Sequence, residues 1–433
     1  MAKFQDLAIE LVSEIFSYLN CNDLSELCLV SRLFNLIAEC LMYKSVRLYR
    51  PKSRRSRITP LLRTLLNRPT LARHVQLLRL GWGWTVVRDP DSTPQTRQDN
   101  TLFSLASNRL GLPQPRWAEE VHAFLLLHIL PNLQTLSMNG CGYLRERIEC
   151  SLTTPVEDLP AGLKSLRIFR DVGDGPVRAT PTMLLALMRL PCIRKITSEM
   201  HLNYDHTYST KALSKILSSA EYRGRSTIQN LSFRNGCFLA CLLEGILQVP
   251  RALTYFSYEG FIHLDTTQTA TFRAALRHLR PTLQYLRLGW VYELDGGPPD
   301  GDDEESYTIG SLRDWPALRT VDCGLLALVG KAPVARSRLV DVLPRVIRQL
   351  KVHQMHDLPE CWEYLEEIMQ WTVSDVTDQI VELLERREEC GLQELVELTV
   401  CLRERDAVME TEARLEAACD AASVMGVRVN VEH

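Results

Sequence analysis

The sequence predicts an α/β protein in which a unit of three helices precedes an irregular solenoid of strand–helix repeats, with a parallel sheet on the concave face. Two observations predict this class. Residues 7–41 carry apolar side chains at the spacing of amphipathic helices. After them, a short phrase that ends in alternating apolar and polar residues returns along the rest of the chain, and this alternation is typical of strands.

The N-terminal helices are indicated by apolar spacing and by capping signals. A first helix is expected over residues 7–19 and a third over residues 33–41. Asp23 is expected to cap the second helix, because Glu26 follows at the spacing of a capping box. Three such short helices bury little apolar surface by themselves, so the unit is expected to pack on a partner or on the rest of the chain.

The repeated phrase reads LPNLQTLSM from Leu130, VPRALTYFSY from Val249 and LPRVIRQLKV from Leu343. The first apolar residue of each copy falls on Val75, Leu133, Leu163, Ile193, Ile228, Leu253, Leu283, Leu318, Ile347 and Leu395. Helical patterns lie between the copies, and one strand plus one helix per roughly 20–30 residues is the layout of leucine-rich repeats. A doubly wound sheet, the main alternative, would need longer apolar strands followed by glycine-rich turns, which the sequence lacks.

The polar positions of the expected strands would line the concave face as one column. This column reads Arg79, Ser137, Arg167, Thr197, Ser232, Ser257, Arg287, Asp322, Lys351 and Thr399. Arginine and tyrosine are frequent binding anchors, and basic residues suit an acidic or phosphorylated segment. The expected substrate-binding residues are Arg79, Arg167, Arg234, Tyr255, Tyr285, Arg287 and Lys351. Solvated strand faces are the alternative for each single residue.

Composition favours a protein of the cytoplasm, the nucleus or both. The chain has 433 residues, 45% hydrophobic and 24% charged, without an apolar run of membrane-spanning length or a signal peptide. Its 13 cysteines are scattered, which favours free thiols. Residues 360–433 hold 19 acidic and 6 basic residues, whereas residues 1–359 hold 44 basic and 34 acidic. The long acidic end argues against nucleic acid as a partner, and no membrane partner is expected.

Searches for catalytic motifs find little. The segments HQMHD from His353 and HLNYDH from His201 place histidines near aspartates, but no third metal ligand is identifiable. No nucleophile elbow, phosphate-binding glycine loop or dinucleotide fingerprint occurs, so no catalytic residue, metal or cofactor is expected. The segments 88–100 and 295–306 are expected to be polar loops. Four aromatic residues, Trp82, Trp84, Trp290 and Tyr292, are expected just past strand ends.

Residues 7–48 resemble an F-box. They contain the Leu-x-x-Glu-Leu opening at Leu7, the Ile-Phe-Ser-Tyr-Leu helix end at Ile15, an Asp-Leu pair and the Leu-Val-Ser-Arg-x-Phe segment at Leu29. Ala8 stands where the family commonly has proline. The resemblance implies that this unit docks on a Skp-family adaptor, which bridges to a cullin. The family's adaptor-facing residues fall on Leu7, Leu11, Ile15, Leu19, Leu24, Leu27, Val30 and Phe34.

The resemblance and the repeats together give an expected domain plan. It assigns residues 1–48 to the F-box, 49–70 to a basic linker and first helix, and 71–433 to a leucine-rich-repeat-like solenoid with an acidic part at 360–433. The resemblance implies a non-catalytic substrate receptor of an SCF-type (Skp–cullin–F-box) ubiquitin ligase. A scaffold that binds the adaptor without a cullin is the alternative. The expected partner of the repeats is a protein substrate, which the resemblance does not specify. The basic run from Arg50 to Arg57 fits a linker or a nuclear signal.

Overall fold

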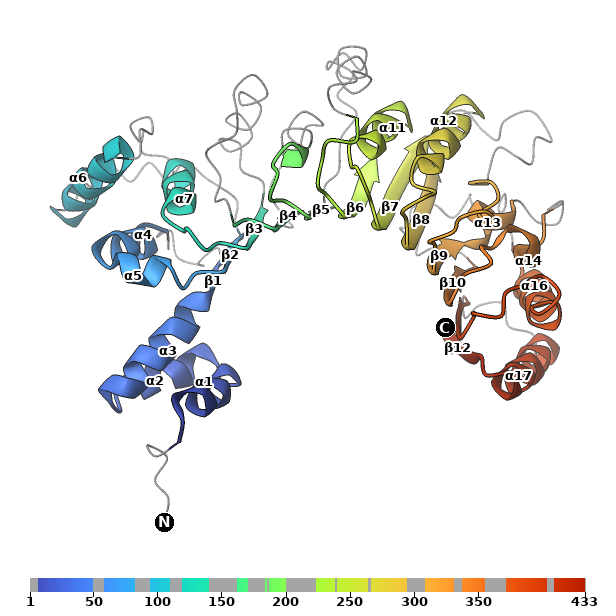
Figure 1. Cartoon of the computed structure of the whole chain (residues 1–433), viewed down its shortest axis with the longest axis horizontal. Helices are drawn as coiled ribbons and strands as arrows, with labels where there is room; N and C mark the ends of the chain where they lie inside the picture. The colour runs from blue at the N-terminus through green and yellow to red at the C-terminus, as the bar shows by residue number, and fades with distance from the viewer. Residues whose placement is uncertain are drawn as a thin grey trace. The chain divides into compact units, whose positions relative to one another are not determined.

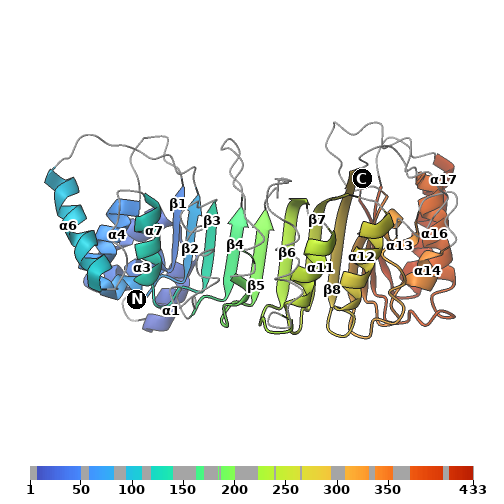
Figure 2. The same ribbon diagram turned by 90° about the horizontal axis from the view of Figure 1, so that it is seen from above.

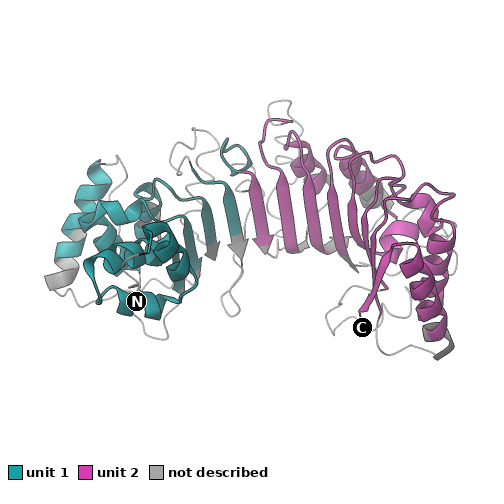
Figure 3. Cartoon of the chain, turned by 60° about the horizontal axis from the view of Figure 1, so that its bottom comes forward, with its two compact units in different colours: residues 1–193 teal, residues 194–433 magenta. Residues whose placement is uncertain are grey.

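In the computed structural model three helices open the chain, and parallel strands with helices between many of them follow (Figures 1 and 2). The structure describes residues 7–49, 58–81, 94–109, 119–139, 162–169, 184, 187–199, 223–237, 240–263, 266–293, 308–330, 337–354, 371–402 and 409–432. The chain divides into two compact units, residues 1–193 and 194–433 (Figure 3). Each unit contains parallel strands in which neighbours in the sheet are also consecutive in the chain.

Unit 1 begins with three helices and continues into four strands. The elements are α1 (Ile9–Ser17), α2 (Cys21–Leu27), α3 (Arg32–Lys44), β1 (Ser45–Tyr49), α4 (Ile58–Asn67), α5 (Pro69–Ala72), β2 (Leu77–Gly81), α6 (Pro94–Arg109), α7 (Glu119–His128), β3 (Thr135–Asn139) and β4 (Ser165–Phe169). Strand β2 pairs in parallel with β1 on one side and β3 on the other, and β3 pairs with β4. Helix α3 passes directly into β1, so no loop separates the three helices from the first strand.

Unit 2 contains eight strands among its described residues. Its elements are β5 (Lys195–Glu199), β6 (Asn230–Cys237), α11 (Ala240–Gln248), β7 (Tyr255–His263), α12 (Thr266–Arg277), β8 (Tyr285–Glu293), β9 (Thr320–Gly324), α13 (Leu325–Val329), α14 (Leu339–Val342), β10 (Gln349–His353), α16 (Val373–Glu385), β11 (Glu397–Cys401), α17 (Met409–Val424) and β12 (Arg428–Glu432). All neighbouring pairs from β5–β6 to β11–β12 are parallel.

Every copy of the repeated phrase ends in a strand, as the sequence predicts. The first apolar residue of each copy packs in the core, with at most 1% of its surface exposed. In most copies the residue after it donates a backbone hydrogen bond to the preceding copy, for example from Gln284 N to Thr254 O at 2.8 Å and from Arg348 N to Arg319 O at 2.7 Å. The phrase therefore forms a buried turn that sets the register of the next strand.

One face of the strands is apolar. Leu78, Leu136 and Leu166 in unit 1, and Phe256 and Leu286 in unit 2, are at most 1% exposed. In unit 2, helices α11 and α12 pack side by side and lie across one face of the sheet (Figure 2). Because strand side chains alternate, the residues between these apolar positions point to the opposite face, which is polar.

Three local predictions are wrong. Asn20, not Asp23, caps α2: its side chain accepts hydrogen bonds from the backbone of Asn22 and Asp23. Residues 94–100 belong to helix α6 and not to a loop, since Asp99 is held by two hydrogen bonds from Arg63, each 2.5 Å. Trp290 and Tyr292 lie within β8, because this strand continues to Glu293 against β7.

Some predicted features lie outside the described residues. They are Trp82 and Trp84, the basic run 50–57, the loop 295–306 and the segment from His201 to His206. Within the part of the chain that the structure describes, no helix is long and apolar enough to cross a membrane. The same residues contain no group of three or more histidine, cysteine or acidic side chains arranged to hold a metal ion.

Candidate functional site

The three N-terminal helices enclose a small core of their own. Val12 and Phe16 of α1, Leu24 of α2, and Phe34, Ile37 and Ala38 of α3 are buried together. The rings of Phe16 and Phe34 meet edge to face, with centroids 5.2 Å apart, a favourable geometry for aromatic pairs. Six buried side chains are few for an independent core, so the neighbouring strand and helices contribute to its stability.

Side-chain caps fix two of the three helix starts. Asn20 caps α2, and the hydroxyl of Ser31 accepts a hydrogen bond from Phe34 N at the start of α3. Helix α1 has no side-chain cap, because the residue before it is Ala8. Because Asn20 and Ser31 start the next helix at once, the loops between the three helices are only a few residues long, and the helices stay close together.

The helices also leave a surface of exposed apolar side chains. Among the expected adaptor-facing residues, Leu7, Leu11, Ile15 and Val30 are exposed, at 39%, 50%, 42% and 64%. Leu19 and Leu27 are half-buried at the edge of the core, whereas Leu24 and Phe34 lie inside it. The exposed set is larger than the sequence indicated and also includes Ile9, Tyr18, Leu29, Leu33 and Leu36. Such a concentration of exposed apolar residues marks an interaction surface.

Helix α3 is fixed to the start of the sheet. Arg68 donates two hydrogen bonds to the Glu39 carboxylate, at 2.6 and 2.7 Å. Cys40 Sγ lies 3.4 Å from His74 Nε2, and Gln76 N donates to Lys44 O at 3.0 Å. Helix α3 is therefore tied to the segment between α4 and β2, and it runs directly into β1.

The polar column predicted from the sequence is in register. Hydrogen-bonded neighbours pair Arg79 with Ser137 and Ser137 with Arg167 in unit 1. In unit 2 the paired column runs through Thr197, Ser232, Ser257, Arg287, Asp322, Lys351 and Thr399. Two members were missed: Arg47 of β1 precedes Arg79, and Asn430 of β12 follows Thr399. The strands that carry them lack the repeated phrase.

Acidic and basic side chains lie next to one another on neighbouring strands of the polar face of unit 2. Arg287 Nη2 lies 3.0 Å from Glu259 Oε1, and its Nε lies 3.3 Å from Asp322 Oδ2. His353 Nε2 lies 2.7 Å from Asp322 Oδ1, and Arg234 Nε lies 3.8 Å from Glu259 Oε2. These charges neutralise one another within the chain, so Arg234 and Arg287 are less available to an acidic ligand than their sequence positions indicated.

Two tyrosines lie at the edge of this network. The rings of Tyr255 and Tyr285 are stacked, with centroids 4.3 Å apart and planes at 10°. Burial, and then the nearby Asp322 carboxylate, raise the pKa of the Tyr285 hydroxyl well above its usual value. Tyr285 therefore stays protonated and donates a hydrogen bond to Asp322 at 3.5 Å. A flat, neutral aromatic pair of this kind is suited to packing against a partner side chain.

Lys351 is also paired within the chain. Its Nζ lies 2.6 Å from Glu432 Oε2, and this hydrogen bond raises the pKa of Lys351 and lowers that of Glu432. Burial, followed by the hydrogen bond to Glu432, raises the pKa of Cys401 to about 11. Cys401 is thus a protonated thiol at neutral pH and is unsuited to nucleophilic catalysis.

The polar face of unit 1 has a different charge pattern. In-register positions of β1–β4 carry Arg47, Arg79, Ser137 and Arg167, and none of the outward positions on these four strands holds aspartate or glutamate. Like charges on directly paired strand positions, as in Arg47 and Arg79, repel each other.

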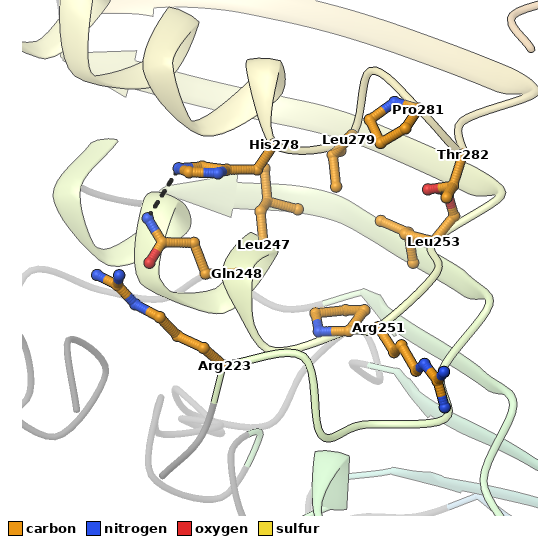
Figure 4. A pocket seen from close by; sticks show the side chains of 10 residues that line it. Arg223, Leu247, Gln248, Arg251, Leu253, His278, Leu279, Pro281 and Thr282 are labelled. Carbon is orange, nitrogen blue, oxygen red and sulfur yellow. Dashed lines mark hydrogen bonds between the residues drawn. The ribbon is translucent and has the colours of Figure 1, made fainter. Parts of the chain in front are cut away.

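A cavity of about 240 Å³ lies on the loop edge of unit 2, near the C-terminal ends of α11 and α12 (Figure 4). Arg223, Gln248, Arg251 and His278 supply its polar lining, and Gln248 Nε2 lies 3.2 Å from His278 Nε2. Leucines and prolines supply most of the remainder. Thr282 supplies the one hydroxyl among the described lining residues, and this hydroxyl donates a hydrogen bond to Leu253 O at 2.8 Å and not to a base.

A comparison with protein families identifies the N-terminal unit. Residues 4–43 match the family model of the F-box domain, a match that includes α1, α2 and α3 up to residue 43. F-box domains in general bind Skp-family adaptors of SCF-type ubiquitin ligases, and proteins that carry them are typically non-catalytic. A comparison with curated proteins gave no match to this chain. The class defined by sequence and fold is thus an F-box module followed by α/β units with parallel strands.

Proposed function

We propose that the protein is the substrate-recognition subunit of an SCF-type ubiquitin ligase. In this role the F-box binds the Skp-family adaptor, through it a cullin, and the polar face of the strands binds the target protein. The observation that carries the proposal is the F-box match at residues 4–43, with exposed Leu7, Leu11, Ile15 and Val30 on its helices. Holding a target beside the transfer machinery raises its effective concentration there, which requires no catalytic residue in this chain.

The adaptor surface is best defined by the exposed residues. Leu7, Leu11, Ile15 and Val30, with the half-buried Leu19 and Leu27, form our proposed contact set. Leu24 and Phe34 would support this surface from the core and not contact the adaptor first, because only 4% and 8% of their surfaces are exposed. Substituting either of them would test folding and not binding.

We further propose that the strands and helices after the F-box form a leucine-rich-repeat-like solenoid. The domain plan would be residues 1–48 for the F-box, 49–70 for the linker and first helix, and 71–433 for the repeats. Support comes from the consecutive parallel strands and from the buried turn residue that each repeated phrase supplies. Solenoids of this type use the exposed face of their strands to bind other proteins.

Co-purification tests the proposed function. The full chain is expected to bring down a Skp-family adaptor and a cullin, and Leu11→Asp/Ile15→Asp should lose both, because two charges placed on an apolar interface are strongly unfavourable. Leu105→Asp on α6 is the matched control: this leucine is similarly exposed, at 53%, but lies outside the F-box. Its adaptor binding should equal that of the wild type.

The same experiment distinguishes a ligase subunit from the alternative, a scaffold that binds the adaptor without a cullin. An adaptor that binds without any cullin would favour a scaffold that acts outside a ligase. Failure of the wild type to bind either partner would reject both functions and leave α1–α3 as a helical cap on the strands. Circular dichroism of each variant shows whether a loss of binding reflects unfolding.

A further inference from the structure

Strand β12 lies at the edge of the sheet in unit 2 (Figure 1). It pairs in parallel with β11, and no other described strand pairs with it. The register sets Val429 beside Leu398 and Val431 beside Val400. The two β11 residues are fully buried, whereas the two valines of β12 are only half-buried. The apolar face of the sheet is therefore less completely covered at β12 than at β11.

The hydrogen bonds to β11 show which backbone groups of β12 are left over. Arg428 N and Glu432 O both bond to the segment 396–402, which contains β11, at 2.9 and 2.8 Å. Alternate residues of a strand point their backbone groups to the same neighbour, so those of Val429 and Val431 point away from β11. No described residue bonds to the backbone of these two valines on that side. Such a row of N–H and C=O groups is a template for a further strand.

The start of β12 is fixed within the chain. Gly426 adopts a φ of +75° at the turn between α17 and β12, and Val427 N donates a hydrogen bond to Ala422 O at 2.9 Å. Arg387, which is 9% exposed, donates from Nη1 to Met425 O at 3.0 Å. A strand held in this way loses little conformational freedom when it pairs, which favours association.

The sequence of β12, Arg-Val-Asn-Val-Glu, is complementary to itself in the antiparallel direction. A two-fold axis at Asn430 places Arg428 opposite Glu432 of a second copy, at both ends of the strand. It also places Val429 opposite Val431 of the second copy. These are hydrogen-bonded positions of an antiparallel pair, because the two valines carry the outward backbone groups. Opposite charges and β-branched residues that face each other directly stabilise a strand pair.

The charged residues of β12 are accessible for this contact. Arg428 is exposed. Glu432 already accepts a hydrogen bond from Lys351 through Oε2 at 2.6 Å, but the two oxygens of a carboxylate accept about four hydrogen bonds. Strand β1, which pairs only with β2 among the described strands, lacks this complementarity. The same operation about Arg47, at the centre of β1, would place two arginines opposite each other.

We infer that two copies of this chain associate through β12, whose strands pair antiparallel about Asn430 with ion pairs between Arg428 and Glu432. The inference concerns unit 2 and does not rest on the proposed function. A pair of five-residue strands buries less area than a standard stable interface of about 1,600 Å². We therefore expect a dissociation constant of about 1–50 μM. The dimer would carry two F-boxes and two polar faces, which raises avidity for a target with two binding segments.

Sedimentation velocity of the full chain at concentrations from about 1 to 100 μM tests the inference. The wild type is expected to pass from monomer to dimer over this range. Val431→Pro removes an outward N–H group, and proline is tolerated in an edge strand where the N–H faces solvent. The variant should therefore keep the circular dichroism spectrum of the wild type while its dimer weakens at least about tenfold.

Charge variants test the antiparallel register. Arg428→Glu and Glu432→Arg should each weaken self-association at least about tenfold, because each places like charges opposite one another at both ends of the strand pair. An equimolar mixture of the two variants should recover the wild-type affinity, since one chain then supplies only acidic and the other only basic residues at these ends. This recovery also shows that both variants fold. Arg47→Glu on β1 is the matched control and should leave the dimer unchanged.

Three results would overturn the inference. A wild type that stays monomeric at the highest concentration would leave the edge of β12 to a strand of another protein. A dimer that Val431→Pro and Arg428→Glu leave unchanged would place the interface elsewhere. A mixture of the charge variants that associates no better than either variant alone would reject the antiparallel register. Dimerisation as predicted, without adaptor binding, would support the inference and reject the ligase role.

Discussion

Asp322 is the residue on which most side chains of the unit 2 network converge. Its carboxylate lies 3.3 Å from Arg287, 2.7 Å from His353 and 3.5 Å from the Tyr285 hydroxyl, and the residue is 6% exposed. A nearly buried carboxylate is tolerated only when such partners compensate for lost solvation. The same partners would be left incompletely paired if the charge were removed.

Asp322→Asn should therefore destabilise the protein. We expect a loss of about 2–3 kcal/mol in the free energy of unfolding, since Arg287 would keep only Glu259 as its carboxylate partner in this network. Urea unfolding followed by circular dichroism measures the change. Glu394→Gln is the control, because Glu394 pairs with Arg319 and Arg348 on the surface, where pairs contribute little. An equal loss in both variants would contradict the central role of Asp322.

At the scale of elements, helices α4, α6 and α7 form a layer that encloses a histidine. The ring of His122 packs against Phe103, with centroids 4.8 Å apart, and its Nδ1 is shielded from solvent and has no hydrogen-bond partner among the described residues. Burial lowers the pKa of His122 to about 4, although the nearby Asp99 opposes the shift. The folded layer thus favours the neutral ring.

This shift makes the layer sensitive to acid. The unfolded chain takes up a proton at His122 near pH 6.5, whereas the folded chain does so only near pH 4. Stability linked to this ring is therefore complete above pH 6.5 and is lost as the pH falls from 6.5 to 4. Between pH 8 and pH 5, wild type should lose about 2 kcal/mol more than His122→Gln, measured by urea unfolding. Equal losses would show that the ring titrates normally in the folded state.

Comparing the elements with the sequence shows which local signals were sufficient to predict a strand or a helix. Strands β2–β11 were predictable, because each follows a copy of the repeated phrase, in which apolar and polar residues alternate after a buried turn residue. Strands β1 and β12 were missed because one follows α3 directly and the other follows Gly426 without the phrase. The polar residues 94–100 at the start of helix α6 favour a loop in the sequence. The hydrogen bonds to Asp99 come from Arg63, which lies 36 positions away and which no local pattern connects to it.

For the candidate sites, the sequence predicted which strand positions the residues occupy but not which side chains they contact. Periodicity placed Arg79, Arg287 and Lys351 in one column, and the strand register agrees. It could not reveal that Glu259 and Asp322 pair with Arg287 from the two adjacent strands, since those carboxylates lie 28 and 35 residues away in sequence. For the same reason the sequence did not distinguish buried Leu24 from exposed Leu11 on the F-box.

At the scale of the whole molecule, the strand pairing is local in sequence. Within each unit a strand pairs only with the strands before and after it, so the contacts that stabilise one repeat come mainly from its neighbours. Stability in such an arrangement is approximately a sum of repeat and interface contributions, and damage to one repeat spreads first to adjacent ones. This property distinguishes a solenoid from a globular domain that unfolds in a single step.

Leu395→Ala tests that property. Leu395 is fully buried at the turn before β11, so the substitution should cost about 2–5 kcal/mol locally. Hydrogen exchange measured by mass spectrometry should then accelerate in β10, β11, β12 and α16 while α1–α3 keep wild-type rates. Val396→Ala, at the next residue and 51% exposed, should change neither region. Faster exchange throughout both units would mean that the chain unfolds as one cooperative body and would reject the solenoid, because adjacent repeats alone would then not set local stability.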